Sequence, residues 1–240
     1  IIDVEVNLRK SKVNAAKAAI EVGKYFTDDI RKIKKAYKKA LTKYKHFRLK
    51  VKKGILPSEI LDGCREQYEE SNESGYISYG HKSSKSSQCE KNILNIALIG
   101  HSYNLYDNYV NMDIIPKLKR LGANIITIDM IDERTIHKKS NLLNKKIFWY
   151  FGTKVMGSIY HLLDRNDISG IIYVMSFGCG IDSFVCDLAE RKIRRNKDIP
   201  FIVLTIDEHS GEAGLNTRIE AFIDMIRWRN NNESNFSPYG

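Results

Sequence analysis

Residues 171–218 read IIYVMSFGCGIDSFVCDLAERKIRRNKDIPFIVLTIDEHSGEAGLNTR, and this stretch decides the fold class. It contains two short apolar runs rich in β-branched residues, Ile171–Met175 and Phe201–Thr205. Each run is followed by a polar, glycine-containing segment and then by a helical pattern, so the order strand, loop, helix occurs twice. This alternation predicts an α/β fold with a parallel sheet, in which ligands bind beyond the carboxyl ends of the strands.

The loop expected after the first strand, residues 176–180, places a cysteine between two glycines. Cys179 stands between Gly178 and Gly180 at the start of the next helix, where unpaired N–H groups and the helix dipole favour a thiolate. The glycines would let something large, such as a cluster, a phosphate or another chain, approach the backbone. The same spacing also fits a buried cysteine in a tight turn.

The loop expected after the second strand carries groups that could transfer protons. Glu208, His209 and Glu212 follow the strand closely, and a carboxylate with an imidazole could perform acid–base chemistry near neutral pH. A purely structural reading is also open, in which Asp207 or Ser210 caps the next helix and His209 bonds a backbone carbonyl.

Four further residues are candidates for holding a cofactor or an anion. Gly178 and Gly180 would give it room, and Ser183 lies in the first turn of the helix that follows Cys179. Arg218 would reach the strand ends from the last helix, where it could hold an anionic ligand or form an ordinary ion pair with Glu208.

The rest of the chain completes a doubly wound α/β domain with a basic helical N-terminal extension. We expect about four mostly parallel strands with right-handed crossovers, the first two at 96–99 and 124–129. Periodicity predicts helices at 8–26, 29–53, 57–70, 148–164 and 211–228 and leaves 131–146 unassigned. The predicted parts are a helical region 1–70, a polar linker 71–92, the α/β domain 93–229 and a disordered tail 230–240.

Composition excludes several classes of protein. The chain has 240 residues, of which 42% are hydrophobic, and its four cysteines do not form the framework of a small secreted domain. No apolar run reaches the roughly 18–20 residues of a membrane span and no signal peptide is visible, so we expect a cytoplasmic protein without membrane contact. The net charge of +10 is concentrated in the first quarter of the chain. It allows nucleic acid or an acidic partner, but a solvated helix face explains it better, and we rank nucleic-acid binding last.

Three segments resemble one protein family. FGCGIDSF (177–184), LTIDEHSGEAGLNTRIEAF (204–222) and LIGHSYNLYDNYVNMDIIPKLKRLG (98–122) are similar to the 2-hydroxyacyl-CoA dehydratase D-component family, more closely to its activase-related, CoA-activase-associated branch. The third segment looks like that branch's G-R-P-Y-N-x-Y-D-x-x-x-N motif. The motifs are co-linear, and the similarity extends over roughly residues 93–227.

The resemblance implies a 4Fe-4S cluster held by cysteine thiolates from several loops. Cys179 matches the family's third cluster cysteine and is the predicted metal ligand. The contexts of the first two family cysteines do not occur, because Cys64 and Cys89 stand in other surroundings. Cys186, two helical turns further on, is expected to face the core. This chain alone therefore has one credible ligand.

A second departure concerns the loop after the first strand of the domain. His101 and Ser102 replace the family's Arg-Pro pair, which removes a fixed cation and a rigid turn. Any anion-binding role implied for this loop is therefore in doubt. The chain also opens at Ile1 without a methionine, and we expect it to be the C-terminal portion of a longer protein.

The function implied by the resemblance is reductive dehydration of a 2-hydroxyacyl-CoA within a larger assembly. The expected partners are an ATP-dependent activase, a second dehydratase subunit, or both, and acyl-CoA is a possible ligand. Glu208 and His209 would be the catalytic candidates. The alternative is a non-catalytic α/β interaction module that has lost the cluster site, which the missing cysteines and the altered loop favour.

Overall fold

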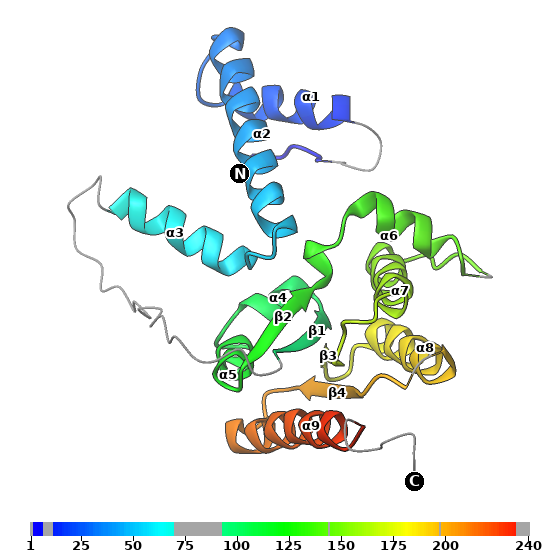
Figure 1. Ribbon diagram of the computed structural model, residues 1–240. Helices are drawn as coiled ribbons and strands as arrows, with labels where there is room; N and C mark the ends of the chain where they lie inside the picture. The colour runs from blue at the N-terminus through cyan, green and yellow to red at the C-terminus, as the bar shows by residue number, and fades with distance from the viewer. Residues whose placement is uncertain (1, 7–11, 70–92, 144, 197, 234–240) are drawn as a thin grey trace. The chain divides into compact units, whose positions relative to one another are not determined.

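The computed structural model describes residues 2–6, 12–69, 93–143, 145–196 and 198–233 (Figure 1). It divides into two compact units, Ile1–Ile55 and Leu56–Gly240. The predicted linker 71–92 and residues 234–240 of the predicted tail lie outside the described residues. Among the described helices, none combines the length and the apolar character that crossing a membrane requires.

The first unit contains two helices, α1 (Lys12–Gly23) and α2 (Ile30–Lys52). Asp29 caps α2, because its carboxylate accepts hydrogen bonds from the main-chain N–H groups of Arg31 at 2.9 Å and Lys32 at 3.2 Å. On α2, Ile33 is buried, whereas Ile30, Leu41 and Tyr44 are exposed.

The second unit is a four-stranded parallel sheet with helices on both faces (Figure 1), which confirms the predicted α/β fold. The strand order is β2-β1-β3-β4. The elements in chain order are α3 (Pro57–Glu69), β1 (Leu94–Gly100), α4 (Ser102–Tyr106), α5 (Ile114–Arg120), β2 (Ala123–Thr127), the 3-10 helix η1 (Ile128–Met130), α6 (Glu133–Ser140), α7 (Tyr150–Leu163), β3 (Gly170–Ser176), α8 (Gly180–Asn196), β4 (Phe201–Ile206) and α9 (Glu212–Glu233).

The core lies on both sides of the sheet. Ile96 and Leu98 of β1 face the side covered by α5 and α9, while Ala97 and Ile99 face the side covered by α6, α7 and α8. All four side chains are fully buried. Burial on both faces explains why these strands read as continuous apolar runs rather than as alternating patterns.

Several elements differ from the predicted ones. β2 ends at Thr127, because Ile128–Met130 turns into a 3-10 helix. The unassigned region contains α6, which begins after Asp132, whose carboxylate accepts from the N–H of Arg134 at 3.1 Å. α9 continues through Glu233, past the predicted start of the tail at residue 230.

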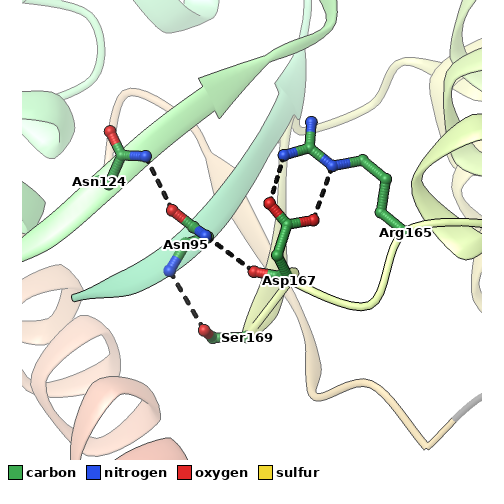
Figure 2. A network of polar contacts seen from close by, with 5 residues as sticks. All are labelled: Asn95, Asn124, Arg165, Asp167 and Ser169. Carbon is green, nitrogen blue, oxygen red and sulfur yellow. Dashed lines mark hydrogen bonds and ion pairs between the residues drawn. The ribbon is translucent and has the colours of Figure 1, made fainter. Parts of the chain in front are cut away.

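A hydrogen-bond network joins β1, β2 and the turn before β3 at the amino end of the sheet (Figure 2), the edge opposite the predicted site. The Asn95 side chain donates to the carbonyl oxygen of Asp167 at 2.9 Å and accepts from Nδ2 of Asn124 at 2.7 Å. The Asn95 main chain donates to Oγ of Ser169 at 3.1 Å. Arg165 holds the Asp167 carboxylate through two contacts of 2.8 and 2.6 Å, which steadies the turn before β3.

We expect Asn95→Ala to lower the free energy of unfolding by about 1–2 kcal/mol, because its side-chain hydrogen bonds to β2 and to the turn before β3 are lost. Urea denaturation would measure this loss. Asn124→Ala is the matched control, since it removes only the second of these bonds and should cost less. Equal losses in the two variants would contradict the central role of Asn95.

Candidate functional site

The centre of the sheet contains a topological switch point. After β1 the chain passes to α4 and α5 on one face, whereas after β3 it passes to α8 on the opposite face (Figure 1). β1 and β3 are hydrogen-bonded neighbours, so the switch point lies between their following loops at the carboxyl edge, and we call this region the crevice. Crevices of this kind are the usual ligand sites of open α/β sheets.

The β1 side of the crevice is an aromatic stack. The imidazole of His101 lies between the rings of Tyr103 and Phe151, with centroid distances of 5.0 and 3.4 Å. Burial lowers the pKa of His101, and the negative charge of Asp182 opposes part of this effect. His101 therefore presents mainly a neutral imidazole, which can donate one hydrogen bond and accept another.

The β3 side of the crevice is the glycine-flanked cysteine. Gly178 has a φ of +74°, which favours glycine, and a Cβ atom there would meet nothing within 4 Å. Cys179 is half-buried directly before α8. Its carbonyl oxygen accepts from the N–H of Ser183 at 2.9 Å and from the Ser183 hydroxyl at 3.0 Å, so Ser183 stabilises the turn.

The two sides are joined by a pair of polar side chains. The buried amide of Asn104 donates to Oγ of Ser176 at 3.1 Å, which connects α4 to the end of β3. Burial raises the pKa of the Tyr103 phenol, and the charges of Cys179 and Asp182 raise it further. Tyr103 is therefore a neutral hydrogen-bond donor beside the cysteine.

A buried carboxyl group lies beneath this crevice. The Tyr173 hydroxyl donates to Oδ1 of Asp182 at 2.5 Å, and both residues are fully buried. The other oxygen, Oδ2, has no hydrogen-bond partner among the described residues. Burial raises the pKa of Asp182, while Tyr173 and His101 partly oppose the shift. In the sequence this aspartate resembles an ordinary first-turn residue, and nothing local marks it as buried.

The asparagine and tyrosine residues of the motif after β1 have structural roles. Tyr106 donates to Oδ2 of Asp129 at 2.9 Å, at the end of the neighbouring strand. Asp107 accepts from the main-chain N–H groups of Tyr109 and Val110, at 3.0 and 3.1 Å. The buried Asn111 donates to the carbonyl oxygens of residues 104 and 105, at 3.0 and 2.8 Å. These contacts hold the segment that carries His101 and Asn104.

The loop after β4 places its charged residues in solvent. The side chains of Glu208 and His209 are 81% and 87% exposed and lie 3.7 Å apart. The turn itself is held by Asp207, whose Oδ1 accepts from the N–H of His209 at 3.0 Å and from the Ser210 hydroxyl at 2.8 Å. The hydrogen bond from Ser210 lowers the pKa of Asp207.

The structure does not bring the predicted residues of the two loops into direct contact. The main-chain N–H of Phe177 donates to the carbonyl oxygen of Ile206 at 2.8 Å. This bond joins the two loops where they leave β3 and β4. Within the described residues, no hydrogen bond or ion pair links Cys179 to Glu208 or His209.

Two charged side chains of α9 contact β4 and α5. Arg218 donates to the carbonyl oxygen of Val203, in the middle of the edge strand β4. Glu212 forms an ion pair of 2.8 Å with the buried Lys117 of α5, which lowers the pKa of Glu212. In this arrangement Arg218 stabilises the sheet edge.

The described residues do not fit a complete iron–sulfur cluster. They include no group of three or more His, Cys, Asp or Glu side chains placed to hold a metal ion. Cys186 packs in the core, as predicted, and burial raises its pKa to about 12, so it is a poor thiolate ligand. The side chains of Cys64 and Cys89 lie outside the described part. Cys179 is therefore the one half-exposed thiol that the described chain offers.

Comparison of the chain with known protein families identifies the family to which it belongs. Residues 1–131, more than half of the chain, match the CoA enzyme activase uncharacterised domain. The chain belongs to this family. Residues 127–226 match the 2-hydroxyglutaryl-CoA dehydratase, D-component, which confirms the resemblance stated from the sequence. No curated protein matches the chain.

The two matches meet within one sheet. The activase domain match contains β1 and β2, whereas β3 and β4 lie in the dehydratase D-component match. Because β1 and β3 are hydrogen-bonded neighbours, each match supplies one side of the crevice. His101 comes from the first and Cys179 from the second.

Proposed function

We propose that this chain is a component of a 2-hydroxyacyl-CoA dehydratase-type assembly, in which Cys179 supplies one thiolate ligand to an iron–sulfur cluster. The observation that carries the proposal is the position of Cys179. It is half-buried before the first turn of α8, in the crevice between β1 and β3. The matches to an activase-related domain and a dehydratase component support the assembly.

The local chemistry around Cys179 suits the binding of a soft metal. The first N–H groups of α8 and its dipole stabilise negative charge at this position. Open space above Gly178 leaves room for a group larger than a side chain. His101 and Tyr103 can donate hydrogen bonds into the same crevice, and hydrogen bonds to sulfur tune such clusters.

The remaining ligands would come from a partner subunit or from residues outside the described ranges. In the proposed assembly an ATP-dependent activase delivers an electron, and the complex removes water from a 2-hydroxyacyl-CoA. Glu208 and His209 remain candidates for proton transfer, and their exposure fits exchange with solvent or with a partner surface. Gly178 and Gly180 would give room for the cofactor, and Ser183 would hold the cysteine turn.

The test uses the intact protein, purified anaerobically with its accompanying subunits and reconstituted with iron and sulfide. We expect Cys179→Ala to weaken iron binding by at least the roughly 10–100-fold that changes around metal ligands cause, with loss of the visible absorbance. Cys186→Ala is the matched control, since this core thiol should leave the iron content unchanged. Unchanged iron in Cys179→Ala, equal losses in both variants, or no iron uptake by the unmodified protein would each contradict the proposal.

A second candidate is a non-catalytic interaction module. The observation that favours it is that Cys179 is the single half-exposed thiol in the described part of the chain, where no group of side chains could hold a metal ion. Such a module would retain its protein partner after Cys179→Ala, with no change in redox properties. A cluster subunit would lose its redox activity in the same variant, so the two functions are separable in one preparation.

A further inference from the structure

A large groove lies on the α6–α8 side of the sheet, separate from the crevice. Its volume is about 1170 Å³, and it lies between the segment before α7 and the outer sides of α7 and α8. α7 and α8 pack against each other in the second unit (Figure 1). The apolar residues of the groove include Ile147, Phe148, Trp149, Phe184 and Leu188. None of the residues that form the crevice lines it.

The aromatic residues of the groove are unusually exposed. Phe148 is 85% exposed, Phe184 51% and Trp149 40%. The ring of Trp149 meets both phenylalanine rings edge to face, with centroid distances of 6.4 Å. Exposed aromatic clusters of this kind are typical of surfaces that another macromolecule covers.

The polar rim of the groove is strongly basic. Five cations line it, namely Lys145, Lys146, Arg191, Lys192 and Arg195. The one carboxylate in the lining, Asp164, pairs with Lys139. Arg191 pairs with Asp187, and Lys192 lies 4.5 Å from the centre of the Tyr160 ring.

Three of these cations have no ion-pair partner within the described residues: Lys145, Lys146 and Arg195. A ligand that binds in this groove must therefore provide apolar surface for the aromatic rings and negative charge for the three cations.

We propose that this groove docks an acidic amphipathic helix of a partner protein. On α8, Ile181, Phe184 and Leu188 follow one another at i, i+3 and i+7, so the apolar stripe runs along the helix. A second helix laid along this stripe would bury its own apolar residues between the aromatic rings. Its flanking carboxylates would meet the unpaired cations of the rim. This inference stands whether or not Cys179 binds a metal.

Other occupants fit the groove less well. Nucleic acid prefers rings that present flat faces to the bases, but the Trp149 ring stands at 85° and 69° to its two neighbours. The volume exceeds the roughly 300–1,000 Å³ of ordinary small-ligand sites. A second copy of this chain carries a net charge of +10 and its exposed helix α2 is rich in lysine, so it would be repelled.

The chain offers a site-specific probe for this proposal. It contains two tryptophans, and Trp228 is a 69% exposed residue of α9 outside the groove. In a Trp228→Phe background, the remaining tryptophan fluorescence, excited selectively over the tyrosines, reports on Trp149 alone. The ligand would be a synthetic helical peptide of about 18 residues with leucines at i, i+3, i+4 and i+7 and glutamates beside them. The matched peptide carries lysines in place of the glutamates.

We expect the glutamate peptide to give a saturable blue shift of Trp149, and Arg195→Glu to weaken its binding by about tenfold or more. Phe184→Ser should weaken it as well, which tests the apolar part of the groove. Lys138→Glu on α6 is the matched charge control. This exposed lysine does not line the groove and should change binding less than about twofold. Circular dichroism would verify that each variant is folded.

Several results would overturn the proposal. They are no response to the glutamate peptide, equal binding of the lysine peptide, or equal losses in Arg195→Glu and Lys138→Glu. Tighter binding of a single-stranded oligonucleotide or of decanoyl-CoA at Trp149 would assign the groove to a different ligand. A negative result here would leave the iron test of Cys179 unaffected, because that test measures another site.

Discussion

Replacing Tyr173 by phenylalanine should lower the free energy of unfolding by about 2–3 kcal/mol at neutral pH. The Tyr173 hydroxyl is the one hydrogen-bond donor that the described residues give to the side chain of the buried Asp182. Without it, both carboxyl oxygens of Asp182 would be buried and unpaired. Urea denaturation of the two proteins at the same pH would measure the difference.

The loss should grow as the pH rises. Burial raises the pKa of Asp182 in the folded protein above its unfolded value of about 3.9. Its contribution to stability is therefore fully present below the unfolded pKa and is lost as the pH rises through the folded pKa. The hydrogen bond from Tyr173 opposes the shift, so Tyr173→Phe raises the pKa of Asp182 further. The difference between wild type and variant should thus be small near pH 4 and largest above neutrality.

A double variant provides the control. Tyr173→Phe combined with Asp182→Leu removes both the donor and the buried charge, and paired apolar replacement can be nearly neutral. The double variant should therefore be more stable than Tyr173→Phe alone at neutral pH, with a flatter dependence on pH. If Tyr173→Phe has the same free energy of unfolding as the wild type at every pH, the hydrogen bond between Tyr173 and Asp182 does not contribute to stability.

Gly157→Ala should lower the free energy of unfolding by about 2–3 kcal/mol, through overpacking where α7 meets α6. A Cβ atom at Gly157 would overlap the carbonyl oxygen of Ile136, which belongs to the backbone of α6 and cannot rotate away. Alanine gains about 1 kcal/mol over glycine in helix propensity, but the backbone clash outweighs this gain. Thermal and urea unfolding would both register the loss.

Gly214→Ala in α9 is the matched control for this substitution. Nothing lies within 4 Å of the position that its Cβ atom would occupy, so helix propensity should act alone. We expect a gain of about 0.5–1 kcal/mol. If alanine is tolerated equally at both positions, α6 and α7 do not approach as closely as described.

Much of the fold could be predicted from local sequence. Apolar runs such as Ile171–Met175 and Phe201–Thr205 coincide with β3 and β4, because strands that contact helices on both faces of a parallel sheet are mostly apolar. Asp29 caps α2 and Pro57 begins α3, as short-range signals predict. The core position of Cys186 followed from its distance of two helical turns from Cys179. The short helix α6 was missed because Ile136 is the one apolar residue that it buries.

The candidate site depended far more on tertiary structure. Local sequence identified Cys179 at the start of a helix, and it identified Glu208 and His209 as ionisable residues after a strand. It could not show that these two residues project into solvent. It also could not show that His101 stacks on Phe151, fifty positions away in the chain.

By itself, the sequence determined the parallel α/β class and the cysteine between its glycines at the start of a helix, because these depend on periodicity and caps within a few residues. The tertiary structure decided which distant side chains contact one another. His101 stacks on Phe151, Tyr173 donates to Asp182, and basic and aromatic side chains line one groove. These contacts depend on the strand order β2-β1-β3-β4 and on which face of the sheet each helix covers. Those choices arise from packing between distant segments, and no local pattern encodes them.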